Sequence, residues 1–185
     1  MHLKKLFITV LFIFMAAVPL NAADHTIKAQ NNAYWHNNKG LLYLQDKYYY
    51  GAIKEFQIAI DLNPNSQASA VYYVNLGVTY EKIGYHNLAR PCFEKAVSLN
   101  VLCFDYYLKL AENYKKLGIV ENELLKLRND KSSPLNEVLI GLLYIQKGEI
   151  STGITVLDDF CNKEPNLIIT TGVKNYLNEI IKTKL

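Results

Sequence analysis

The feature that most constrains the fold of this chain is a repeated pair of residues, a small residue followed three positions later by tyrosine. The pairs are Gly40 and Tyr43, Gly77 and Tyr80, Ala111 and Tyr114, and Gly141 and Tyr144. Successive small residues are 37, 34 and 30 positions apart. An internal period of this length indicates a repeat architecture, in which no unit buries its apolar face alone and neighbouring units must stack.

Apolar residues within the segments recur at the spacing of an amphipathic helix, with positions three or four apart on one face. Turn-forming residues divide each segment into two helices of about 12 to 14 residues, within the usual range for globular helices. We expect the turns near residues 47–49, 84–87, 118–121 and 148–152. The residues that show the spacing are Ala52, Phe56 and Ala59 in the first segment and Ala89, Phe93 and Ala96 in the second.

At these positions the sequence resembles the tetratricopeptide repeat family. The second segment matches the family pattern best, with Tyr73, Leu76, Gly77, Tyr80, Ala89, Phe93 and Ala96. The other segments depart from it, at Lys39 in place of leucine and at Glu123 and Gly153 in place of alanine. The resemblance covers about residues 33–166, and it implies an all-α, right-handed α-solenoid of about four helix-turn-helix repeats.

The spacing sets the expected boundaries. The third segment is four residues short, close to one helical turn, so its second helix should end early, near Asn129. Terminal repeats need a polar outer face, and the last segment is interpreted as a capping helix. The expected organisation is a signal peptide at 1–22, a loose segment at 23–32, repeats at 33–66, 70–103, 104–133 and 134–167, and the capping helix at 168–185.

The N-terminus has the parts of a secretory signal peptide. Lys4 and Lys5 precede an uncharged, mostly apolar run from Leu6 to Leu20, and cleavage is expected after Ala22, with Ala23 as second choice. The run is shorter than the roughly 20 residues that cross a bilayer core. The sequence therefore predicts export to the periplasm or the medium of a bacterium, with no membrane span after cleavage. The alternative is an uncleaved segment that holds the protein to the membrane.

Charge and residue spacing argue against several functions. Removal of residues 1–22 lowers the formal charge from +3 to +1, and a nearly neutral chain does not suit binding to nucleic acid phosphates. His25, His36 and His86 lack the spacing of metal ligands. No phosphate-binding loop or nucleophile motif occurs in the sequence. We therefore expect a non-enzymatic protein with no catalytic residue, metal or cofactor.

The family resemblance also implies where a partner binds, because the first helix of each pair lines a concave face that often holds an extended peptide. Asn37, Asn75 and Lys109 match parts of the family's carboxylate clamp, but Leu41 and Asp105 do not, so an intact clamp is not expected. The candidate groove residues are Tyr34, Asn37, Leu41, Leu44, Val71, Val74, Asn75, Val78, Glu81, Leu108, Lys109, Glu112, Lys115, Val138, Leu142 and Ile145.

Two interpretations of this groove stay open. Val71, Val74 and Val78 either form an exposed apolar patch, which marks an interaction site, or they pack against neighbouring helices. The leading function is a protein-interaction adaptor of the cell envelope with a protein or peptide partner. The alternative is a chaperone-like or assembly factor that holds apolar segments of several clients. The sequence does not specify the oligomeric state.

Overall fold

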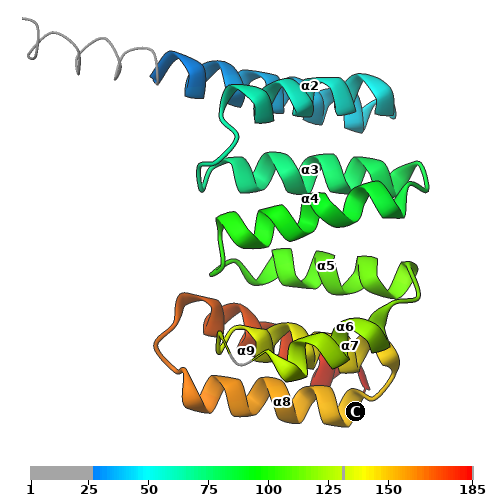
Figure 1. Cartoon of the computed structure of the whole chain (residues 1–185), viewed down its shortest axis with the longest axis vertical. Helices are drawn as coiled ribbons and strands as arrows, with labels where there is room; N and C mark the ends of the chain where they lie inside the picture. The colour runs from blue at the N-terminus through cyan, green and yellow to red at the C-terminus, as the bar shows by residue number, and fades with distance from the viewer. Residues whose placement is uncertain (1–26, 131, 185) are drawn as a thin grey trace, which may run out of the picture.

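The structure is a computed structural model that describes residues 27–130 and 132–184. The predicted signal peptide and residues 23–26 lie outside this part. The described chain is a stack of antiparallel helices (Figure 1). The helices are residues 27–45, α2 (Tyr49–Leu62), α3 (Ser69–Lys82), α4 (His86–Leu99), α5 (Phe104–Lys116), α6 (Val120–Asn129), α7 (Asn136–Lys147), α8 (Ile150–Lys163) and α9 (Ile168–Lys184). The all-α solenoid expected from the repeat is confirmed.

A left-handed residue ends the first helix of each pair, seven positions after the small residue of the repeat. Gly84, Gly118 and Gly148 hold this position with φ values of 81°, 69° and 95°, and Lys47 holds it in the first repeat with φ 60°. A positive φ stops the helix and turns the chain back, and glycine adopts it without steric cost. All four turns lie where the sequence predicts them.

Small residues let the two helices of a pair approach closely. A Cβ atom on Gly77 would lie 2.7 Å from the ring of Phe93, and one on Gly141 would lie 2.6 Å from Leu157. These distances are too short for a carbon–carbon contact. The glycine and the large residue sixteen positions later therefore act as a matched pair in the core of a repeat.

The third repeat departs from this packing. Its second helix, α6, ends at Asn129, as the shortened spacing predicts. Glu123 stands in α6 where Ala52 and Ala89 pack in the first two repeats, and its carboxylate pairs with Lys126 at 2.6 Å. Glu123 is buried although it is charged and larger than alanine, and in this repeat α6 contacts α5 only sparsely. The helix α5 packs instead directly against α7.

The C-terminal half closes into a bundle around α7. Six consecutive residues of this helix, Val138 to Leu143, are buried, so α7 has neighbours on every side. The helix α9 packs on α8 and crosses back to α5. There Gly172 lies against Phe104, and the rings of Phe104 and Tyr176 are 5.3 Å apart. Thus the expected capping helix also closes the concave side of the last repeats.

The N-terminal boundary differs from the prediction. The sequence predicts a loose segment before residue 33, yet residues 27–32 are helical and continuous with the first repeat. Extension of an existing helix fixes one residue for each new hydrogen bond, which is far easier than nucleation. The buried Ala33 anchors the helix on which these residues propagate.

Candidate binding groove

The exposed part of the concave face lies on the first helix (27–45), α3 and α5, and we call it the open groove. Its apolar members are Tyr34, Leu41 and Val71, which are 63%, 40% and 44% exposed. Leu44 is half-buried beside them. These side chains come from two adjacent repeats and leave an apolar surface in water.

The other predicted apolar residues of the open groove pack partly against the core. Val74, Val78 and Leu108 are half-buried and contact the core cluster of the C-terminal half. Packing against neighbouring helices therefore accounts for part of their surface. Val71 is the valine of α3 that a partner could contact most fully.

Two asparagines join the first helix to α3. The Asn75 side-chain amide donates a hydrogen bond of 2.8 Å to Oδ1 of Asn37, and Asn37 is only 4% exposed. A buried amide bond of this kind fixes the register of neighbouring repeats. Asn37 is thus committed to the fold and has little surface for a ligand.

A charged pocket of about 450 Å³ adjoins the apolar surface, between α3 and α5. Lys116 pairs with Glu81 at 2.6 Å, and Lys109 pairs with Glu112 at 2.9 Å. The Asn113 amide also donates to Glu81, at 3.0 Å. The pocket therefore presents paired charges of both signs.

The sequence missed part of this pocket. Lys82 and Lys116 line it, whereas the predicted Lys115 is exposed and does not. Lys116 follows Lys109 by seven positions, so the two share one helix face. That spacing was the signal that would have selected Lys116 over Lys115.

The predicted groove does not continue into the last repeat. Val138 and Leu142 are completely buried, and Ile145 is half-buried against the same core. The reason is the bundle around α7, which α9 closes from the concave side. Burial, and after it the charges of Glu112 and Glu179, raise the pKa of Tyr176 on α9. The open groove therefore ends at α5.

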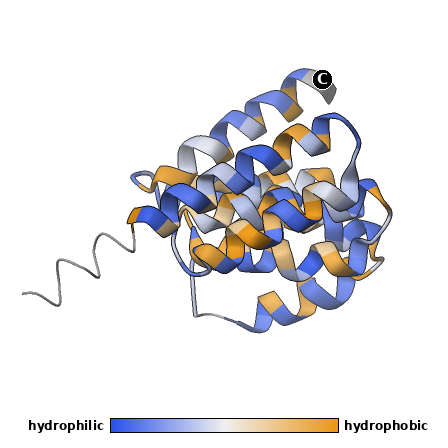
Figure 2. Cartoon of the chain, turned by 90° about the horizontal axis from the view of Figure 1, so that it is seen from above, coloured by the Kyte–Doolittle hydropathy of each residue, from blue (hydrophilic) through white to orange (hydrophobic). Residues whose placement is uncertain are grey.

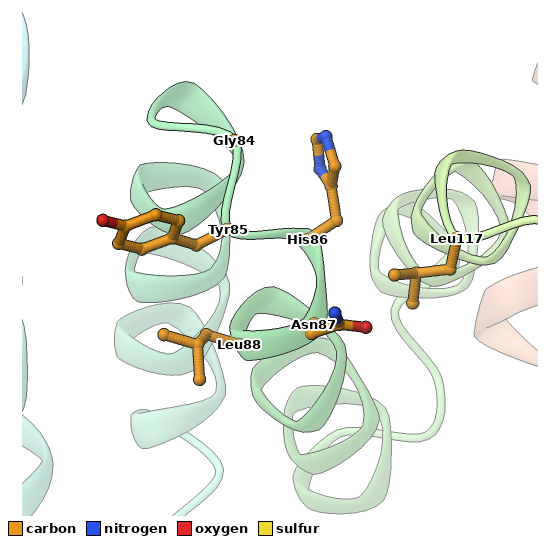
Figure 3. Close-up of a pocket in the computed structure, with 6 residues that line it drawn as sticks. All are labelled: Gly84, Tyr85, His86, Asn87, Leu88 and Leu117. Atoms are coloured by element: carbon orange, nitrogen blue, oxygen red, sulfur yellow. The ribbon is translucent and has the colours of Figure 1, made fainter.

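A second pocket, of about 380 Å³, lies at the turn between α3 and α4 (Figure 3). The side chain of Asn87 points toward Leu117, while Tyr85 and Leu88 point away from it. Nδ1 of His86 is buried and has no hydrogen-bond partner. The sequence carries no motif that predicts this pocket, because its residues belong to a repeat turn.

The remaining histidine chemistry is structural. His36 Nδ1 lies 2.6 Å from Glu55, and Lys39 lies 2.7 Å from the same carboxylate. Burial by itself would raise the pKa of Glu55, but the hydrogen bonds from Lys39 and His36 lower it.

Within residues 27–130 and 132–184, no three His, Cys, Asp or Glu side chains are grouped as metal ligands. No helix of that region is long and apolar enough to cross a bilayer.

Comparison with known proteins identifies the repeat. The tetratricopeptide repeat model matches the sequence twice, at residues 36–66 and 70–100. This chain is a tetratricopeptide repeat protein. The two matches coincide with the helix pairs of the first and second repeats. Tetratricopeptide repeat proteins are in general non-catalytic scaffolds for protein interaction.

Relatives of this tetratricopeptide repeat protein are distant. A TPR repeat-containing protein of Methanocaldococcus jannaschii is 25% identical over 174 residues, and the match covers 82% of this chain and 30% of that protein. The chain thus spans under a third of that relative's length. The crystal structure of MamA is 23% identical over 73% of this chain and 74% of its own, with a TM-score of 0.49. YrrB, whose structure is described as having an unusual peptide-binding site, is 18% identical over 77% of this chain and 74% of its own, with a TM-score of 0.47.

Proposed function

We propose that this tetratricopeptide repeat protein is a non-catalytic adaptor of the bacterial cell envelope that binds a short peptide segment in the open groove. The observation that carries the proposal is an apolar surface on two adjacent repeats beside a charged pocket. Apolar side chains supply affinity, and a few placed polar groups fix the orientation of a ligand. An exported location is proposed from the signal-peptide pattern of residues 1–22.

The length of the open groove favours a short ligand. It extends over the first helix, α3 and α5, and α9 with the buried residues of α7 closes the face beyond α5. A segment with apolar side chains would contact Tyr34, Leu41 and Val71. A charged or polar residue further along it would reach Glu81, Lys109 or Lys116.

A peptide library selected against the purified protein tests the proposal. We expect the selected peptides to share an apolar motif with a polar residue at a fixed distance. Their affinity should fall at least about tenfold when Leu41 and Val71 are both changed to lysine, because a buried lysine loses its hydration. Leu125→Lys is the matched control, since Leu125 is similarly exposed, at 54%, but lies on α6.

The outcomes separate the two candidate functions. A shared motif and loss of binding only in the Leu41→Lys, Val71→Lys protein support a selective adaptor. Unrelated apolar peptides that bind equally well would replace it with a chaperone-like holder. Equal loss in the Leu125→Lys control, or no loss in either variant, would refute the open groove as the binding surface.

A further inference from the structure

The first helix exposes an apolar face on the side that points away from the stack. Ile27, Trp35 and Leu42 are 57%, 57% and 61% exposed, and Tyr34 and Leu41 border them. Figure 1 places this helix at one end of the molecule, and Figure 2 looks onto that end, where hydrophobic and hydrophilic positions alternate along the helix after the grey trace. A terminal repeat is expected to present a polar outer face, so this surface needs a partner.

The size of the face fits an interface. These five side chains leave roughly 500 Å² of apolar surface in water, judged from their exposed fractions and the about 150–250 Å² of an aromatic side chain. A monomer rarely exposes a contiguous apolar patch larger than a few hundred Å². Each partner of a stable complex contributes about 800 Å², and the apolar side chains of this face supply more than half of that area.

The pattern of the face is that of a heptad seam. Positions 27, 31, 34, 38, 41 and 45 are separated alternately by four and three residues, and none of them is charged. Ile27, Tyr34 and Leu41 alternate with the amide residues Asn31, Asn38 and Gln45. We call these six positions the outer seam, with Trp35 and Leu42 along its edge. Seams of this spacing pack against another helix, and an amide at the core position specifies register.

We propose that the outer seam is a homodimer interface in which the first helices of two copies pair in parallel. In a parallel pair, each amide residue lies opposite the same amide residue of the other subunit. Each apolar residue likewise lies opposite the same apolar residue. Antiparallel pairing would set the amides opposite Ile27, Tyr34 and Leu41, and would bury them without hydrogen-bond partners. The absence of charge within the seam removes the repulsion that self-pairing would otherwise cause.

The opposite end of the molecule favours a closed dimer over a chain of copies. Figure 1 places α8 at that end, and this helix exposes Thr155, Asp158 and Asn162, which do not complement an apolar seam. Head-to-tail contact between the two ends is therefore disfavoured. An interface that uses the same surface on both copies closes after two subunits. The outer seam shares Tyr34 and Leu41 with the open groove, so a second copy and a peptide would compete for these two side chains. Trp35 and Leu42 lie outside the open groove, and their substitution therefore tests the dimer separately from the proposed function.

Sedimentation equilibrium tests the dimer. The protein is purified after any N-terminal cleavage that its source cells carry out. We expect a monomer–dimer equilibrium whose dissociation constant rises at least about 100-fold in Trp35→Glu, Leu42→Glu. Asn32→Glu is the control, since Asn32 is exposed on the same helix but off the seam. Unchanged helical circular dichroism in both variants shows that the fold is kept.

Disulfide trapping tests the pairing direction. Cys103 is half-buried, whereas Cys92 and Cys161 are buried, so Cys103 is first changed to serine to prevent its own crosslinking. In this background, Asn31→Cys and Gln45→Cys should each form a covalent dimer, because parallel helices bring each position within about 7 Å of its own copy. A monomer at every concentration would overturn the proposal and assign the face to a different protein. A dimer that survives Trp35→Glu, Leu42→Glu would overturn it too. A seam-dependent dimer without disulfide at residues 31 and 45 would overturn the parallel pairing.

Discussion

Lys47 occupies the left-handed turn position that glycine holds in the three repeats that follow, with φ 60°. A side chain at positive φ places its Cβ close to the backbone, at a cost of about 1–2 kcal/mol. We expect Lys47→Gly to raise the free energy of unfolding by about 0.5–1 kcal/mol, since glycine's greater freedom in the unfolded chain offsets part of the gain. Urea unfolding measures the change.

The reciprocal substitution is the control. Gly84 has φ 81° and open space where a Cβ atom would stand, so Gly84→Ala adds backbone strain without a packing clash. It should lower the stability by about 1 kcal/mol. Destabilisation by Lys47→Gly would show that the Lys47 side chain makes a contact that outweighs its strained backbone.

Glu55 is the residue whose ionisation should couple stability to pH. Its pKa in the folded protein is lower than the ordinary value of 4.5, because Lys39 and His36 bond to the carboxylate. A lowered pKa gives stability that is complete above the unfolded value and is lost as the pH falls through the folded value. We expect Glu55→Gln to destabilise the protein at pH 7 by roughly 1–2 kcal/mol. The deficit should shrink once the pH falls below about 4.5.

Urea unfolding of both proteins across this pH range measures the effect. Asp61→Asn, on the exposed side of the same helix, controls for the loss of one negative charge. A deficit of Glu55→Gln that stays constant from pH 7 to well below the unfolded pKa would contradict the assigned ion pairs.

At the scale of elements, α9 holds the C-terminal half together through a close contact with α5. A Cβ atom on Gly172 would lie 2.7 Å from the Cβ of Phe104. Gly172→Val should therefore push α9 away from α5 and lower the stability by about 1–3 kcal/mol. The measurement is urea unfolding, with Thr171→Val at the adjacent exposed position as the control. Equal effects of the two substitutions would mean that α9 does not pack on Phe104.

The sequence predicted the elements well because their signals are local. In every repeat, a turn residue lies seven positions after the small residue and marks the end of the first helix. Apolar residues three or four positions apart mark the buried face of each helix. The early end of α6 at Asn129 followed from the spacing alone. The helical conformation of residues 27–32 was missed, since their polar composition resembles that of a loose segment.

The closure of the groove was not predictable from the repeat. It depends on contacts of Phe104 with Gly172 and Tyr176, about 70 residues away along the chain, and residue spacing does not encode such pairs. A local signal existed in the segment Val138–Leu143, which has no polar position. A helix that is apolar all round is buried all round. That rule would have removed Val138 and Leu142 from the groove.

At the scale of the molecule, two halves of the stack have different roles. The N-terminal half keeps an exposed concave face, whereas the C-terminal half is a closed bundle around α7. The buried hydrogen bond between Asn37 and Asn75 holds the open groove in shape without a ligand. The ion pairs Glu81–Lys116 and Lys109–Glu112 do the same in the charged pocket. A preformed groove costs little ordering on binding. We therefore regard the closed half as the rigid support of the open one.

Site-specific photocrosslinking in the source cells tests the central claim, that the open groove is the binding face. A photoreactive residue replaces Val71 in one protein and the similarly exposed Leu125 of α6 in another. We predict that the Val71 position crosslinks to a defined partner and that the Leu125 position does not, because only Val71 lies in the groove. Crosslinking of that partner from Leu125 alone, or equally from both positions, would contradict the account.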